Sequence, residues 1–312
     1  MIDHLAKQPT FAGEQPATRT DPGGPIAPES PLPVVVYTAQ AKIRHPAHMI
    51  RELVDDFVKG RELGWRLFLR NLQGQYRQTF LGYVWAVLPP LMTTLIWVVL
   101  QSFRVVNFEA PAGVPYVVYV LTGTILWQSF IKALEAPISS INQGREMLVK
   151  LNFPRESLLI AGLAQVLFNF VMQVILLVVV MAVMRVPVPP TAPLFLLGTA
   201  MLIALGLGLG LVLAPVGLLY QDVQRAITTF APFLMYLTPV LYQPPQSGTA
   251  RLLLWANPMA PTLNAARDWL LIGPTPYLAG FLAYSALGLI LTLVGVLVLR
   301  ASMPFLIERM GS

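Results

Sequence analysis

The last three arginines before the first long apolar stretch of the chain are Arg66, Arg70 and Arg77. Arg66 and Arg70 are four residues apart and share one face of a helix that the apolar periodicity of residues 61–72 predicts. Glu62 precedes Arg66 at the favourable spacing for an ion pair, and Arg77 follows at the edge of the apolar stretch. A planar guanidinium matches the charge and geometry of phosphate. These side chains could therefore contact phosphate groups, and ordinary lipid headgroups explain them as well as a specific ligand does.

The other reactive residue types form no catalytic or metal-binding pattern. The 312-residue chain has no cysteine, which excludes disulfides and thiolate metal sites. No carboxylate-rich motif surrounds His45 and His48, so an ordinary surface role is favoured over a metal site. No paired carboxylates or nucleophile–base arrangement suggest hydrolysis or glycosyl transfer. The phosphate-binding pattern G-x-x-x-x-G-K-[ST] is absent as well, so we expect no catalytic residue, no metal and no ATPase site in this chain.

The composition is that of a lipid-embedded protein. Hydrophobic residues make up 55% of the chain and charged residues 12%, whereas soluble domains carry about 25% charged residues. The net charge of +6 could suggest nucleic acid. The basic residues cluster between apolar runs, however, so anionic lipid headgroups are the favoured counter-charge and no nucleic acid is expected.

Several apolar stretches are long enough to cross a bilayer, which takes about 20 residues of helix. They predict an all-α membrane protein with six transmembrane helices. Pro89 and Pro90 predict a kink inside the first stretch, and Gly206 with Gly210 predicts close helix packing in the fourth. The stretches are roughly residues 83–103, 114–134, 157–184, 193–219, 226–242 and 276–299.

Basic residues set the predicted orientation, because cytoplasmic loops are enriched in Lys and Arg. They are concentrated before residue 82, between the second and third stretches, and after the sixth. This distribution places both termini of a multi-pass protein in the cytosol. The stretches themselves hold almost no charge, which argues against proton-coupled secondary transport.

The chain divides into three predicted regions. Residues 1–33, rich in Pro, Gly and Ala, are expected to be disordered and cytosolic. Residues 34–80 form a cytosolic region whose amphipathic interface helix lies in the headgroup layer, and residues 81–312 form the transmembrane domain. Within that domain, residues 251–272 are apolar but short and broken by prolines. They predict a re-entrant pair of helices between spans five and six, with a plain external loop as the alternative.

Four segments, taken in their order, resemble the membrane subunit of ABC-2 type exporters for polysaccharides, most closely the permeases of O-antigen and related lipid-linked glycans. The likeness covers about residues 50–305, and it is the ordered set that is specific. Two positions depart from the family pattern: Gln221 stands where an Arg usually precedes the Asp, and Asn71 stands where an Asp usually follows the Arg. The segments are RNLQGQYRQTFLGYVWAVLPPL, LNFPRESLL, LLYQDVQRAITTFAPFLMYLTPVLY and WANPMAPTLNAARDWLL.

This resemblance implies a transport subunit rather than an enzyme. Such a chain forms a homodimer in the bacterial inner membrane and works with two copies of a separate ABC ATPase subunit. The ATPase binds the ATP and Mg²⁺, so this chain needs no cofactor of its own. The implied substrate is a lipid-linked, O-antigen-like polysaccharide that crosses among membrane lipids. Arg66, Arg70 and Arg77 then become candidates to contact its lipid diphosphate.

The family also implies two cytosolic corners that meet the ATPase. Residues 142–151 are expected to form a short coupling helix with an apolar centre and a charged rim, with a basic loop at the headgroups as the alternative. The other corner lies where the fifth span begins. The candidate coupling residues are Arg145, Glu146, Met147, Lys150, Asp222 and Arg225.

The resemblance also implies that the glycan passes between the first and fifth spans. Aromatic faces give a sugar chain an apolar surface on which to slide, while lipid contact or core packing is the alternative for each side chain. The candidate path residues are Trp85, Trp97, Phe230, Phe233 and Tyr236.

Two other functions stay open. The first is export of a capsule or teichoic-acid glycan, or of a drug or lipid. The second is a non-transporting membrane component of glycan assembly, which tight association with an ATPase would exclude.

Overall fold

The computed structural model describes residues 46–77, 79–150, 154–245 and 256–311, so the predicted N-terminal region 1–33 lies outside it. The regular elements of this part are helices without a strand, which confirms the predicted all-α class. They are α1 (Pro46–Tyr76), the 3-10 helix η2 (Gly82–Ala86), α2 (Leu88–Ser102), α3 (Tyr116–Gln143), α4 (Arg145–Lys150), α5 (Glu156–Val183), α6 (Leu194–Leu219), α7 (Gln221–Leu237), α9 (Met259–Leu271) and α10 (Leu278–Gly311).

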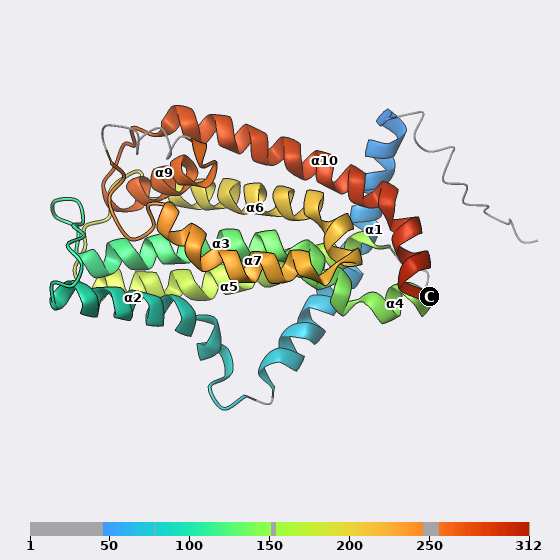
Figure 1. Ribbon diagram of the computed structural model, residues 1–312, viewed down its shortest axis with the longest axis horizontal. Helices are drawn as coiled ribbons and strands as arrows, with labels where there is room; N and C mark the ends of the chain where they lie inside the picture. Colours follow the sequence, from blue (N-terminus) through green and yellow to red (C-terminus); the bar gives the residue numbers. More distant parts are fainter. Residues whose placement is uncertain (1–45, 78, 151–153, 246–255, 312) are drawn as a thin grey trace, which may run out of the picture.

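Four long helices form the body of the molecule (Figure 1). α3 packs against α5 and α6, and α6 packs in turn against α10. α2 lies along α3, and α7 lies along α6 and α3. α1 crosses one end of this bundle and packs on α5, while α9 fills the opposite end between α6 and α10.

These four helices are also the ones that are long and apolar enough to cross a membrane, with α10 qualifying over Leu278–Leu306. The predicted third and fourth spans agree with α5 and α6 to within about one residue at each end. α2 and α7 have 15 and 17 residues, which is short of the about 20 that a span takes. Helix length alone therefore supports four spans among the described residues, not the predicted six.

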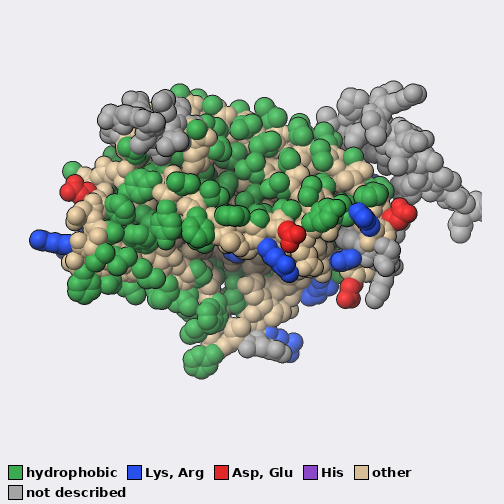
Figure 2. Space-filling model, in the orientation of Figure 1, with side chains coloured by type: hydrophobic (Ala, Val, Ile, Leu, Met, Phe, Trp, Pro, Cys, Tyr) green, Lys and Arg blue, Asp and Glu red, His purple; other side chains and the backbone are tan. Residues whose placement is uncertain are grey.

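The charged side chains are distributed along the axis of the bundle as expected for a membrane protein. Figure 2 shows hydrophobic side chains over most of the visible face, and Lys, Arg, Asp and Glu gathered toward the end where α1 and α4 lie. Charges avoid the hydrocarbon region and concentrate at its borders. In the predicted orientation, the end with α1 and α4 is the cytosolic one.

Glycines in α6 let it approach helices on two sides, as the sequence predicted for packing. A Cβ atom on Gly206 would come within 2.6 Å of the Phe130 carbonyl oxygen in α3. On the other side of α6, a Cβ on Gly208 would lie 2.7 Å from the Thr292 nitrogen in α10. Only residues without a side chain allow backbones to pack so closely. α6 is therefore the central layer between α3 and α10.

The predicted kink at Pro89 and Pro90 is wrong. The chain forms the short helix η2, and α2 then begins at Leu88, so both prolines stand in the first turn of α2. Proline lacks an N–H group, and the first turn of a helix leaves its N–H groups without a carbonyl partner in any case. The two prolines consequently start a helix instead of bending one.

The apolar stripe predicted for residues 61–72 is present on α1, but it faces protein. Leu67, Phe68 and Leu72 are buried in a cluster that includes Leu158 of α5 and Ile138 of α3. Polar and charged residues of α1 lie on the opposite, exposed face. The stripe therefore docks α1 across the cytosolic end of the bundle, and its exposed face is left for the headgroup layer.

A glycine fixes how closely α1 approaches α5, and this gives a first prediction. A Cβ on Gly64 would lie 2.8 Å from the Ile160 side chain and 2.9 Å from the Ser157 carbonyl oxygen. We expect Gly64→Leu to lower the stability of the detergent-purified protein by about 1–3 kcal/mol, the usual cost of overpacking, measured as the shift of its thermal unfolding midpoint. Gly74→Leu is the matched control in the same helix, because nothing lies within 4 Å of a Cβ at Gly74. Equal midpoints for the two variants would contradict this packing.

An ion-pair group ties three helices together at the same end. Arg300 of α10 contacts Asp56 of α1 at 2.6 Å and Glu156 of α5 at 3.8 Å. All three side chains are largely shielded from solvent. Salt therefore screens these ion pairs less than it screens pairs on the surface. These ion pairs fix the positions of α1, α5 and α10 relative to one another at the end of the bundle where α4 lies.

Candidate functional site

A short helix, α4 (Arg145–Lys150), lies within the segment predicted as a coupling helix, at the end of the bundle near the C-terminal end of α10 (Figure 1). Its Leu148 is buried and its Met147 is half-buried against the core cluster of α1, α3 and α5. These two residues, which the sequence placed at the apolar centre of a docking surface, anchor α4 to its own protein. Arg145 and Glu146 are exposed, and the Lys150 side chain lies outside what the structure describes. A coupling role for these residues stays a prediction.

The second predicted corner is the start of α7. Asp222 and Arg225 stand one turn apart, with 3.9 Å between the Asp222 Oδ1 and Arg225 Nη1 atoms. Both side chains are mostly exposed, and an exposed pair of this kind contributes only about 0–1 kcal/mol to stability. Both charges are thus accessible to a partner protein.

The three predicted phosphate-binding arginines occupy different environments. Arg66 is exposed and pairs with Glu62 at 2.6 Å, as their spacing predicted. Arg70 donates to the Asn71 Oδ1 atom at 3.3 Å and to the Met147 Sδ atom at 3.6 Å, which links α1 to α4. Arg77 is exposed just after α1. The structure therefore places all three on or beside one helix, without gathering them into a single site.

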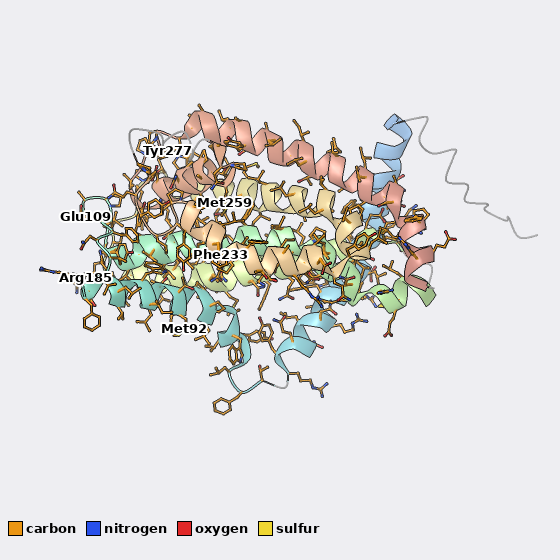
Figure 3. All side chains as sticks on the ribbon, in the orientation of Figure 1. Met92, Glu109, Arg185, Phe233, Met259 and Tyr277 are labelled. Carbon is orange, nitrogen blue, oxygen red and sulfur yellow. The ribbon has the colours of Figure 1, made fainter. Side chains whose placement is uncertain are left out.

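The predicted aromatic path is brought together only in part. The Trp97 and Tyr236 rings meet edge to face, with 5.8 Å between their centroids, and so connect α2 with α7. Phe230 and Phe233 are 60% and 64% exposed on α7, and Figure 3 shows Phe233 there. Trp85 is half exposed in η2. Large apolar side chains left uncovered on neighbouring helices form a surface for lipid or a partner.

A polar cavity of about 770 Å³ lies between α1, α3 and α5, with one residue from α7. The sequence interpretation did not include its amide side chains. The signal available for finding them was the presence of Gln165 and Asn169, together with Gln173, inside a span that is otherwise almost wholly apolar. The amides that line the cavity are Asn71, Gln75, Gln143, Gln165, Asn169 and Gln224.

A second unanticipated feature is the buried Arg267 in α9. Its side chain is 1% exposed and stacks 3.9 Å over the ring of Tyr119 in α3. The guanidinium donates to the Asn264 Oδ1 atom at 2.6 Å and to the Val240 carbonyl oxygen at 3.1 Å. From the sequence, Arg267 only interrupted an apolar segment, and its partners lie up to about 150 residues away along the chain.

The predicted re-entrant pair can be described only in its second half. α9 (Met259–Leu271) is buried along most of its length against α6 and α10. The Asn257 side chain donates to the Thr238 hydroxyl at 2.9 Å, which joins the start of α9 to the end of α7. The first half of the predicted pair lies largely outside the described residues. α9 is thus an interior helix that connects α3, α6, α7 and α10.

Two O-antigen export permeases and one capsule export protein are similar to this chain over more than half of its length. The O-antigen export system permease protein RfbA of Myxococcus xanthus is 31% identical over 222 residues, which are 70% of this chain and 83% of the relative. A protein of that name from Klebsiella pneumoniae is 25% identical over 234 residues, 72% of this chain and 86% of the relative. The capsule polysaccharide export inner-membrane protein CtrC of Neisseria meningitidis is 25% identical over 184 residues, 56% of this chain and 66% of the relative.

The family model that matches is that of the ABC-2 type transporters, over residues 62–271. This region begins in α1 and ends with α9, so it contains both proposed coupling corners, the aromatic residues, the polar cavity and Arg267. Since the match covers more than half of the chain, this protein belongs to the ABC-2 type transporter family.

Proposed function

We propose that this chain is the membrane-spanning permease subunit of an ATP-driven exporter. It moves a lipid-linked, O-antigen-like polysaccharide from the cytosolic to the outer leaflet of the bacterial inner membrane. The observation that carries the proposal is the similarity, over most of both chains, to proteins named as O-antigen export permeases. The absence of a phosphate-binding loop from the full sequence agrees with ATP hydrolysis by a separate subunit.

The proposed topology has six crossings and both termini in the cytosol. The four long helices supply four crossings. η2 and α2 together cover residues 82–102 and supply a fifth crossing. α7, with the residues that follow it as far as Tyr242, supplies the sixth. α9 is then the returning limb of the re-entrant pair at the outer face. Two copies of the chain form the working permease.

In the proposed mechanism, two copies of the ATPase subunit press on α4 and on the start of α7. α4 is anchored through Leu148 in the same apolar cluster as α1, α3 and α5, so a push on α4 reaches the cytosolic half of the bundle. α7 carries Asp222 at one end and Tyr236 near the other. A shift of α7 therefore changes the Trp97–Tyr236 contact and opens a path between α2 and α7. Arg66 and Arg77 meet the phosphates of lipid or of the lipid anchor at the cytosolic side, and Arg70 does so when it exchanges its contacts with Asn71 and Met147 for a phosphate.

Deletion of the gene for this chain, followed by glycan detection on intact and permeabilised cells, tests the proposal. Full-length glycan that is detected only after permeabilisation is the expected result, because synthesis continues while export stops. Complementation with the wild-type chain should restore surface glycan. Unchanged surface glycan in the deletion strain would refute glycan export and leave drug or lipid export. Loss of glycan from both compartments would indicate a role in synthesis.

Capsule export is the second candidate, and similarity to the capsule export protein of Neisseria meningitidis favours it. Both functions use a permease of this kind, so the identity of the trapped glycan distinguishes them. The same deletion strain should be analysed for capsule and for lipopolysaccharide glycan. Trapped capsule with normal surface O-antigen would assign the chain to capsule export.

The proposed coupling role of α4 gives a second prediction. Arg145→Glu or Glu146→Arg reverses one exposed charge at the proposed ATPase contact, and charge reversal at a complementary contact weakens association. We expect each variant to retain less ATPase in co-purification and to export less glycan, while its thermal unfolding midpoint stays near that of the wild type.

Arg185→Glu is the matched control for these charge reversals. Arg185 is exposed at the opposite end of the bundle, as Figure 3 shows, so its replacement should leave ATPase association intact. Normal association and transport in both α4 variants would exclude coupling through these charges.

A further inference from the structure

The polar cavity between α1, α3 and α5 extends deep into the bundle. Asn169 stands at the middle of α5, thirteen residues after Glu156, and this corresponds to about 20 Å along the helix. At such a depth in a bilayer, polar side chains face other protein groups or a water-filled space. The cavity therefore provides a polar compartment within the cytosolic half of the transmembrane region.

The amides around the cavity are paired across helices but not saturated. Gln165 of α5 donates to the Gln75 Oε1 atom of α1 at 3.3 Å, and Asn71 of α1 donates to the Gln143 Oε1 atom of α3 at 3.4 Å. Each pair uses one N–H group and one oxygen lone pair, whereas every amide side chain has two of each. The same amides can thus still donate to and accept from a ligand.

The two cations at the cavity, Lys132 and Arg70, already contact other protein groups. Lys132 contacts Glu135 at 3.1 Å, and Arg70 is bonded to Asn71 and Met147. A phosphate ligand would compete with these contacts for the two cations. A sugar hydroxyl, which both donates and accepts, instead matches the amides, which also do both. The lining consequently favours an uncharged, polyhydroxylated ligand over an anion.

We propose that this cavity binds a short uncharged stretch of the exported glycan. The inference rests on the proposed function, because it assumes that a glycan reaches this side of the protein. The volume of about 770 Å³ falls within the roughly 300–1,000 Å³ of small-molecule sites, so the cavity holds a few sugar units of a longer chain. Gln224 of α7 joins the lining, which connects the bound sugars to the helix that carries the proposed coupling corner and the aromatic path.

Single-cysteine labelling tests this site directly, since the chain has no cysteine of its own. Asn169→Cys is expressed with the ATPase partner, and inverted vesicles are treated with a membrane-impermeant maleimide. Glycan released from the lipopolysaccharide of the host strain is then added as the probe. We expect the thiol to be labelled from the cytosolic side, and labelling to slow in proportion to the glycan that occupies the cavity. Gln165→Cys repeats the test from a second position.

Two cysteine controls define what the labelling reports. Val171 lies two residues after Asn169, on an exposed apolar face of α5. Lipid should keep the impermeant reagent away from the thiol of Val171→Cys. Gln73→Cys is exposed on α1 and does not line the cavity, so it should react at the same rate with and without glycan.

Variants of the lining measure its contribution to binding. Gln75→Met removes one amide from the Asn169→Cys protein, and we expect about 2- to 10-fold weaker protection by glycan, the range for one net hydrogen bond. Gln73→Met, two residues earlier on the exposed side of α1, should leave protection unchanged. Gly74→Leu places a side chain where nothing lies within 4 Å of a Cβ atom, and it should weaken protection by occupying part of the cavity.

Three outcomes would overturn the inference. The first is a thiol at 169 and at 165 that the reagent cannot reach, which would mean a closed, dry space. The second is labelling that glycan never slows. The third is protection by farnesyl diphosphate but not by glycan, which would assign the cavity to the phosphates of a lipid anchor. If the wild-type chain still restores surface glycan in the deletion strain, each of these results rejects the cavity assignment while the proposed function stands.

Discussion

Arg267→Met should leave little folded protein, or protein that unfolds at a much lower temperature than the wild type. Methionine cannot donate to the Asn264 side chain or to the Val240 carbonyl, and it removes the cation from the Tyr119 ring. A buried acceptor left without its donor costs about 1–3 kcal/mol, so the two acceptors together account for about 2–6 kcal/mol. Thermal unfolding of the detergent-purified protein measures the effect.

The geometry around Arg267 explains why this position should be so sensitive. A Cβ on Gly123 of α3 would lie 3.3 Å from the Arg267 Nη1 atom and still closer to the Val240 carbonyl oxygen. The backbone of α3, the turn after α7 and the Arg267 side chain are therefore in direct contact. Close packing of this kind leaves no room for a rearranged side chain to replace the lost donors. Removal of the guanidinium should separate α9 from α3 and from the end of α7.

Two variants make the Arg267 prediction specific. Arg267→Lys keeps the charge but replaces the planar fork by a point donor, so we expect an intermediate unfolding temperature. Arg185→Met changes an exposed arginine at the same end of the bundle (Figure 3) and should unfold with the wild type. If Arg267→Met matched the wild type in stability, its buried contacts would contribute nothing net, and the proposed role of α9 as a fixed interior helix would be wrong.

A reversible cross-link between positions 97 and 236 should stop nearly all glycan export. The rings of Trp97 and Tyr236 meet edge to face at 5.8 Å and join α2 to α7, the two helices between which the proposed path opens. In a Trp97→Cys/Tyr236→Cys double variant these two thiols are unique, because the chain has no other cysteine. A flexible bifunctional thiol reagent avoids the strict geometry that a direct disulfide demands. Surface glycan on cells that are already expressing the variant gives the readout.

The cross-linking result depends on three comparisons. Reduction of the linker should restore export, which shows that the block is the tether and not damage to the protein. Each single cysteine variant treated with the same reagent should continue to export. ATPase co-purification should be unchanged by the cross-link, since α4 and the start of α7 remain accessible. Full export by the tethered protein would place the glycan path somewhere other than between α2 and α7.

Features that depend on neighbouring residues could be read from the sequence. The third predicted span agrees with α5 (Glu156–Val183) almost to the residue, because a long uncharged apolar run has no other stable arrangement in a bilayer. The apolar stripe of α1 and the packing role of Gly206 were recognised for the same reason. Helical periodicity and the lack of a side chain are both local properties.

The residue at which α2 begins and the protein surface that covers the apolar stripe of α1 could not be predicted from the sequence and are seen only in the structure. Pro89 and Pro90 are compatible with a kink or with a helix start, and the position of η2 before Leu88 selected the start. The stripe on α1 would fit a membrane surface as well as a protein surface, and the approach of Gly64 to Ile160 shows that it faces α5. Periodicity identifies which face is buried but not what covers it.

Composition and the length of the apolar runs predict an all-α membrane protein, and the order of four short segments indicates the family by resemblance, because none of these features requires knowledge of distant contacts. Which polar groups contact one another depends on the tertiary structure. The Arg267 guanidinium stacks on the Tyr119 ring, and the Gln165 amide donates to the Gln75 side chain, although the members of each pair are far apart in the sequence. A buried polar side chain must find a partner wherever the fold supplies one. That choice is made by helix packing and is not encoded in the neighbouring residues of the chain.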